Sequence, residues 1–329
     1  MTENMNNYLR DYKKPEIIVR KESETNPDSG CIPESRSTEE IINYGIVNID
    51  KPSGPTSHQV SGYVKDILNL KKCGHSGSLD PRVTGVLPIG LGEGTKIVQA
   101  LLTAGKEYIC IMHIHKDADE QKIRGAINKY IGRINQLPPV RSAVKRQYRE
   151  RSIYYLDILE ISDRDVLFLV GCQAGTYIRK LCHDIGRELG GAHMSELRRT
   201  RVAGFTEDSC CTLQDLQDAC SFYKEGNDKF LRKCIQPVES GVKHLPKVWV
   251  LDSTINSLCN GANLNIPGIS KFENNLKQGT LAAVMSLKNE LVCFGNVVID
   301  PENIMKKDTG IVLKTERVFM KPGVYGKLR

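Results

Sequence analysis

The stretch GHSGSLDP, residues 74–81, predicts a tight loop that presents a single carboxylate. Pro81 has no backbone N–H and disfavours helical conformation at the residue before it, so we expect Asp80 in a loop. Gly74, Gly77 and, just beyond, Gly85 allow the backbone to bend and to approach a ligand closely. Taken alone, an Asp-Pro pair is more typical of a turn in which the carboxylate accepts from backbone donors. The interpretation therefore depends on the rest of the chain.

Composition excludes several classes of protein. The chain has 329 residues, of which 40% are hydrophobic and 26% charged, as in an ordinary globular protein. It contains no run of eighteen apolar residues, so we expect no membrane span. The first thirty residues are polar, unlike a signal peptide. Eleven cysteines without a Cys-x-x-Cys pair indicate buried free thiols in a reducing, cytoplasmic compartment rather than a zinc site.

Positive charge is concentrated in two places. The formal net charge is +7, which fits a polyanionic partner. The segment RSAVKRQYRER at 141–151 contains Arg141, Lys145, Arg146, Arg149 and Arg151. A second cluster consists of Arg198, Arg199 and Arg201. Each cluster alone could be a solvated face, but two of them beside a candidate catalytic loop favour contact with a phosphate backbone.

Apolar periodicity predicts a catalytic domain of mixed helices and strands over residues 41–244. A polar extension, residues 1–40, precedes it. Residues 44–49 are expected to form a strand that leads through a Gly/Pro turn to a helix capped by Thr56 or Ser57. Strands are predicted at 87–91, 106–114, 153–161 and 166–172, and the last two are joined by a Ser-Asp turn. A helix is predicted at 176–189, and a capping-box-like start to another at Thr212–Asp215.

The composition changes near residues 237–246, where a second domain is expected to begin. Beyond this point short apolar runs alternate with turns, which is typical of a small β-barrel of about 75 residues. We therefore divide the chain into the extension 1–40, a catalytic domain 41–244, a barrel 245–322 and a tail 323–329. The predicted fold class is α+β, with a mixed, largely antiparallel sheet in the catalytic domain.

Five motifs in a fixed order together resemble the TruB/dyskerin family of pseudouridine synthases. They are DKP at 50–52, GHSGSLDP at 74–81, KEY at 106–108, GTYIR at 175–179 and GAHMSELRRT at 191–200. The C-terminal segment resembles a PUA RNA-binding domain. The ETNPD extension and the segment LPPVRSAVKRQYRER make the chain most similar to the archaeal type that works with H/ACA guide RNAs. Ser78 departs slightly from the family, which usually has Thr or Ala there, but it keeps the small size.

The resemblance implies that Asp80 is the catalytic carboxylate. The reaction breaks the N1–C1′ bond of uridine, rotates the base and rejoins it through C5, and it requires neither cofactor nor metal. A carboxylate is suited to meet positive charge at C1′. Whether Asp80 adds to C1′ or takes the 2′ proton stays open. Arg179 is expected to pair with Asp80, keeping it ionised and oriented, although an isolated arginine there reads as a surface helix charge.

The other implied site residues bind the flipped-out nucleotide. Tyr108 is expected to stack on the base and to take part in proton transfer at C5, and Leu197 to close the pocket over the base. His75 is expected to help displace the target nucleotide, and Lys51 to brace the catalytic loop. In the PUA-like domain, Gly261 and its neighbouring backbone suit an RNA-binding loop. Tyr108, Leu197 and His75 would otherwise read as ordinary core or loop residues.

Two modes of action follow from the resemblance. The chain is expected to modify the T-loop uridine of tRNA, and to act in an H/ACA particle on rRNA with a guide RNA and small scaffold proteins. The rival interpretation is a non-catalytic RNA-binding scaffold, against which the set of Asp80, Tyr108 and Arg179 argues.

Overall fold

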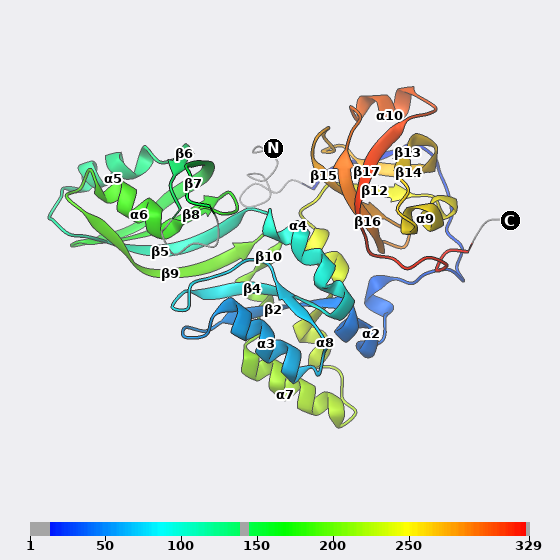
Figure 1. The fold of residues 1–329 in the computed structure, drawn as a ribbon, viewed down its shortest axis with the longest axis horizontal. Helices are drawn as coiled ribbons and strands as arrows, with labels where there is room; N and C mark the ends of the chain where they lie inside the picture. Colours follow the sequence, from blue (N-terminus) through cyan, green and yellow to red (C-terminus); the bar gives the residue numbers. More distant parts are fainter. Residues whose placement is uncertain (1–13, 139–144, 327–329) are drawn as a thin grey trace.

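The structure, a computed structural model, describes residues 14–138 and 145–326 and contains two mixed β-sheets. Figure 1 shows the larger sheet with helices α3 and α7 at one end and α5 and α6 at the other, and the smaller sheet beside α4. The expected α+β class is confirmed. No helix within these ranges has the length and apolar character needed to cross a membrane.

The larger sheet carries the catalytic motifs. Its central path runs β11 (Ile235–Pro237), β2 (Gly45–Lys51), β4 (Thr84–Leu91), β9 (Ala192–Val202), β5 (Lys106–Ile114), β8 (Asp165–Cys172), β7 (Arg149–Ser162) and β6 (Gly132–Gln136), with β3 (Cys73–His75) on β4 and β10 (Phe205–Thr206) on β9. The β4–β9 pairing is parallel and the others recorded in this sheet are antiparallel. All of the segment GAHMSELRRTR except its first glycine thus lies in β9, an eleven-residue strand at the centre of the sheet.

Helices cover this sheet where the sequence places their caps. Thr56 and Thr212 form capping boxes with Gln59 and Asp215 at the starts of α3 and α7. The helix after the β7–β8 pair is shorter than expected, because Tyr177 is its N-cap and Gly190 and Gly191 adopt positive φ after it ends. The helices of the domain are α2 (Thr38–Asn43), α3 (Ser57–Ile67), α4 (Val98–Leu102), α5 (Glu120–Asn128), α6 (Ile178–Gly186), α7 (Leu213–Lys224) and α8 (Leu231–Cys234).

The C-terminal domain includes residues from both ends of the chain. Its sheet runs β1 (Ile17–Val19), β14 (Ile269–Glu273), β12 (Lys247–Val250), β15 (Leu281–Met285), β16 (Leu291–Val297), β17 (Ile311–Val318) and β13 (Leu264–Asn265), with helices α9 (Asp252–Cys259) and α10 (Glu302–Lys306). The N-terminal extension therefore supplies an edge strand here. Tyr325 lies in the predicted tail, yet it is buried in the core of this domain and its hydroxyl donates to Glu290.

A shared apolar core and a buried ion pair join the two domains. Ile46, Val86 and Ile97 of the catalytic domain lie in one hydrophobic cluster with Trp249 and Phe294 of the C-terminal domain. At its border the 3-10 helix η4 (Val238–Val242) supplies Glu239, which forms a bidentate pair with Arg36 at 2.8 and 2.9 Å. The backbone N–H of Leu291 also donates to Glu239, so this carboxylate connects the extension, the catalytic domain and the C-terminal domain.

We predict that Glu239→Ala lowers the free energy of unfolding by about 3–5 kcal/mol, because it leaves the Arg36 charge buried without a partner. The Arg36 and Glu239 side chains are only 9% and 10% exposed. Glu120→Ala, which removes the partner of Arg124 from an exposed pair on α5, is the control and should cost less than about 1 kcal/mol. Urea titrations of both variants measure the difference. If Glu239→Ala and Glu120→Ala lowered the free energy of unfolding equally, the Arg36–Glu239 pair would not join the domains.

Candidate active site

The loop that carries Asp80 is held by the turn between β2 and α3. The backbone N–H of Leu79 donates to the Ser57 hydroxyl at 2.8 Å, at the start of α3. The backbone N–H of Gly54 donates to the carbonyl of Pro81 at 2.9 Å. These contacts are made on both sides of Asp80, so the segment DKPSGPTS fixes the path of the loop rather than touching its carboxylate.

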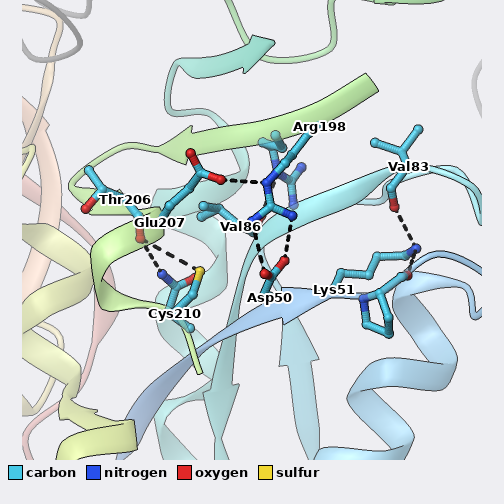
Figure 2. Close-up of polar contacts among 11 residues, drawn as sticks. Asp50, Lys51, Val83, Val86, Arg198, Thr206, Glu207 and Cys210 are labelled. Carbon is cyan, nitrogen blue, oxygen red and sulfur yellow. Dashed lines mark hydrogen bonds and ion pairs between the residues drawn. The ribbon is translucent and has the colours of Figure 1, made fainter. Parts of the chain in front are cut away.

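Lys51 forms the base of this arrangement. Its side chain is completely buried, and its ammonium donates to the carbonyls of Pro52, Pro81 and Val83 at 2.8–2.9 Å. Figure 2 shows the Lys51 side chain directed toward Val83. Burial, followed by the charge of Arg199, lowers the pKa of Lys51, while the charge of Asp80 acts in the opposite direction. With all three protons directed to carbonyls, Lys51 braces the loop and is not available for a phosphate.

Asp80 and Arg179 meet at the open side of the loop. Arg179 lies in the first turn of α6, and its guanidinium donates to the Asp80 carboxylate at 2.5 Å. The expected ion pair is therefore present. Both side chains are more than half exposed, so the pair contributes little to stability and mainly orients the carboxylate.

An apolar floor lies beneath this pair. Leu79 and Val83 of the loop share one buried cluster with Tyr108 of β5 and Ile178 of α6, and the half-buried Leu197 of β9 packs against it. Burial raises the pKa of Tyr108 above its ordinary value, and the Asp80 charge contributes in the same direction. Tyr108 is thus a neutral phenol at rest. The structure brings Asp80, Arg179, Tyr108 and Leu197 to one surface, although they come from four separate elements.

His75 occupies a different position, at the start of the loop. It is the last residue of β3, and its Nδ1 lies 3.4 Å from the backbone N–H of Gly77. Burial, followed by the charge of Arg199, lowers its pKa, which favours the neutral imidazole. Gly77 and Gly85 adopt the positive φ expected of turn glycines, whereas Gly74 lies within the short strand β3 and does not.

Arg198 and Arg199, two of the three arginines in the β9 cluster, have partners within the protein and do not form the phosphate-binding face that the sequence suggested. Arg198 forms a bidentate pair with Asp50 at 2.9 and 3.0 Å and also donates to Glu207 at 2.6 Å. Figure 2 shows Arg198 between these two carboxylates, with Asp50 and Lys51 on β2, which is separated from β9 by β4. Arg199 is 1% exposed. The prediction failed because a run of arginines looks the same whether the partners are phosphates or the protein's own carboxylates and carbonyls.

The first basic cluster is only partly exposed, because Arg149 and Arg151 are half-buried on β7. Arg141 lies outside the described residues, and Lys145 and Arg146 are on the surface. Arg146 and Tyr148 line a cavity of about 550 Å³ together with Lys180, His183 and Arg187 of the α6 region. Asp184 also lines this cavity and lies within ion-pair distance of Lys180, His183 and Arg187, so part of the positive charge has a partner within the protein. In the C-terminal domain, Gly261 has positive φ and open space around it after α9, as a backbone contact loop requires.

Four known domain families match the chain. TruB family pseudouridylate synthase (N terminal domain) matches residues 65–178, and tRNA pseudouridylate synthase B C-terminal domain matches 179–243. DKCLD (NUC011) domain matches 2–61 and PUA domain matches 246–319. These boundaries place Asp80, Tyr108 and Ile178 in the first of these families and Leu197 in the second.

The chain is also similar over almost its whole length to named proteins. It is 52% identical to the probable tRNA pseudouridine synthase B of Methanopyrus kandleri, covering 95% of this chain and 93% of that protein. It is 51% identical to the protein of the same name from Pyrococcus furiosus, covering 97% of this chain and 94% of that protein. Among solved structures, the protein in a Cbf5-Nop10-Gar1 complex superposes with a TM-score of 0.92 at 51% identity, covering 96% of this chain and 97% of that one. A protein in an H/ACA RNP bound to a substrate RNA superposes with a TM-score of 0.89 at 48% identity, covering 96% of this chain and 98% of that one.

We predict that Gly85→Ala destabilises the protein by about 2–4 kcal/mol, because it adds backbone strain and a steric clash. Gly85 has a φ of +102°, and a Cβ there would lie 2.2 Å from the carbonyl oxygen of Arg199, where β4 and β9 approach. Gly62→Ala on α3 is the matched control, since a Cβ at that helical position meets nothing within 4 Å and the change should stabilise by about 0.5–1 kcal/mol. Thermal unfolding compares the two variants. A Gly85→Ala protein as stable as wild type would contradict the close β4–β9 approach.

Proposed function

The chain belongs to the TruB family of pseudouridine synthases, and we propose that Asp80, Tyr108 and Arg179 carry out its isomerisation of uridine in RNA. The observation that carries this assignment is the Asp80–Arg179 ion pair above the apolar floor that contains Tyr108. The proposed substrates are the T-loop uridine of tRNA and, with a guide RNA, uridines of rRNA.

Asp80 meets the charge that develops at the sugar. When the N1–C1′ bond breaks, its electron pair leaves with the uracil ring and C1′ becomes electron-deficient. An ionised carboxylate stabilises that carbon, either by adding to it or by taking the 2′ proton. Arg179 keeps one Asp80 oxygen occupied and oriented at 2.5 Å. The uracil then rotates and joins C1′ through C5, so that no atom is gained or lost.

The apolar floor holds the detached base during this rotation. Tyr108 provides an aromatic ring and Leu197 an aliphatic contact, and stacking on an aromatic ring contributes about 1–3 kcal/mol per base. His75 stands at the start of the loop, where it would enter the space left by the flipped nucleotide. Lys51 keeps the loop in place through its three carbonyl contacts.

Positive charge beside the site suits an RNA backbone. Lys180 is the residue after Arg179 in the sequence, and the cavity that it lines with Arg146, His183 and Arg187 contains one carboxylate, Asp184. Phosphate contacts of this kind position an RNA without reading its sequence. The C-terminal domain matches the PUA family, and its open loop at Gly261 would bind a second part of the RNA.

We place this activity in an RNA–protein particle in the cytoplasm. The relatives of known structure were solved in a Cbf5-Nop10-Gar1 complex and in an H/ACA RNP, which supports small scaffold proteins and a guide RNA as partners of this chain. All eleven cysteines are free thiols, which fits a reducing compartment. Acting as a non-catalytic scaffold is the alternative function, and the following experiment separates the two.

We predict that Asp80→Asn lowers the rate of pseudouridine formation about 10³-fold or more while RNA affinity stays unchanged, because the amide cannot supply the charge needed at C1′. Full-length wild type and variant are incubated with unmodified tRNA and with a guide–substrate RNA pair, and pseudouridine is mapped by chemical probing. Asp66→Asn, at an exposed position on α3, is the control and should leave the rate unchanged. A rate for Asp80→Asn close to wild type would support the scaffold alternative.

A further inference from the structure

Arg199 is a buried cation that has no part in the proposed catalytic scheme. It lies on β9 and is 1% exposed. Its Nε donates to the carbonyl of Val86 at 2.7 Å, and its Nη2 lies 3.4 Å from the carbonyl of Gly77. Within residues 14–138 and 145–326, no carboxylate forms an ion pair or hydrogen bond with this guanidinium. Burying a charge without an ionic partner destabilises a folded protein, so an apolar residue would stabilise the fold better if this position had only a structural role.

Arg199 lies opposite Tyr108 in the sheet. The two residues are cross-strand partners on β9 and β5, so their side chains leave the sheet on the same side. Burial raises the pKa of Tyr108, and the charge of Arg199 opposes the rise.

These contacts connect the two halves of the site. Gly77 lies in the loop three residues before Asp80, Val86 lies on the strand that leaves the loop, and Tyr108 lies on β5. Arg199 therefore holds the loop against β4 from a position opposite Tyr108. Its charge also reaches other buried groups: after burial itself, Arg199 is the largest cause of the lowered pKa of Lys51, Lys106 and His75. The floor of the site is thus electropositive.

The chemistry of the reaction requires a proton relay at this place. Over the whole isomerisation one proton leaves C5 and one arrives at N1, so no external acid or base is consumed. A phenol that gives its proton to N1 of the detached uracil, and then as phenolate takes the proton from C5, ends the cycle unchanged. In the second step the C5–H electron pair returns to the ring. The intermediate phenolate is an anion buried in an apolar floor, and it needs a positive neighbour.

We propose that Arg199 is a positioning residue for this relay, which holds the Asp80 loop from its place opposite Tyr108 and balances a transient phenolate with its charge. The inference rests on the proposed function. It differs from a purely structural role in one respect: Arg199 acts through the Tyr108 hydroxyl, so its effect on the rate depends on that hydroxyl being present.

A double-mutant cycle with Tyr108→Phe tests this dependence. Single-turnover rates on unmodified tRNA are measured for full-length wild type, Arg199→Lys, Arg199→Met, Tyr108→Phe and the two double variants. We expect Arg199→Met to lower the rate about 10²–10³-fold, and Arg199→Lys, which keeps the charge, to restore part of that loss. In the Tyr108→Phe background either Arg199 substitution should lower the rate by less than about a further threefold, because the hydroxyl through which Arg199 acts is already absent. RNA affinity should change less than about threefold throughout.

The pH profile and two controls complete the test. The relay starts from the neutral phenol, so the rate of wild type should fall as pH rises through the pKa of Tyr108. Loss of the Arg199 charge raises that pKa further, so the fall for Arg199→Met should begin at higher pH. Arg124→Lys, at an exposed ion pair on α5, should change neither the rate nor the profile. Thermal unfolding is recorded first, and rates are compared at temperatures where every variant is folded.

The outcomes separate the two proposals. Additive losses in the Tyr108→Phe background would overturn the inference, because Arg199 would then act on the Asp80 loop alone. Equal rates for the Lys and Met variants would overturn the part assigned to charge. If wild type itself forms no pseudouridine on tRNA or on guide-bound RNA, the proposed function fails instead.

Discussion

The active site depends on one buried ammonium group. Lys51 is enclosed at the end of β2 and directs its three protons to the carbonyls of Pro52, Pro81 and Val83. Two of these carbonyls belong to Pro81 and Val83, which follow Asp80 in the loop by one and three residues. Charge-assisted hydrogen bonds are stronger than neutral ones, and here they take the place of the water that the ammonium loses on burial. The loop is therefore rigid before any RNA arrives, and the position of the carboxylate is set by the protein rather than by the substrate.

This arrangement explains why the proposed catalytic pair can be so exposed. Asp80 and Arg179 are more than half accessible and contribute little to folding, yet the backbone beneath them is fixed by Lys51, Ser57 and Gly54. Arg199 follows the same principle, because it is buried and donates to the carbonyls of Val86 and Gly77. Buried cations bound to carbonyls thus hold the geometry, and the exposed pair is left for the proposed contact with RNA.

The sequence predicted the elements better than it predicted their contacts. The strand at Lys106–Ile114 followed from local patterns with its observed limits, and α3 and α7 begin at the caps that the sequence predicted. The Asp80–Arg179 pair spans 99 residues and was available only through the resemblance to a family. Arg198 and Arg199 were misread because local sequence does not reveal which partner a cation has. The β1 strand was missed because Ile17–Val19 is three residues long and pairs with β14, some 250 residues away.

The most direct test of this account is the activity of Lys51→Met. Methionine fills a similar volume but leaves three carbonyls without a donor, so the loop should lose its fixed position while the fold and the RNA surface persist. We predict that single-turnover pseudouridine formation falls about 10²-fold, as expected when reacting groups are misplaced by about 1 Å, with RNA affinity within about threefold of wild type. Lys65→Met, at an exposed position on α3, should leave both quantities unchanged. A Lys51→Met protein that turns over at the wild-type rate would contradict the account, because the position of Asp80 would then not depend on the buried ammonium.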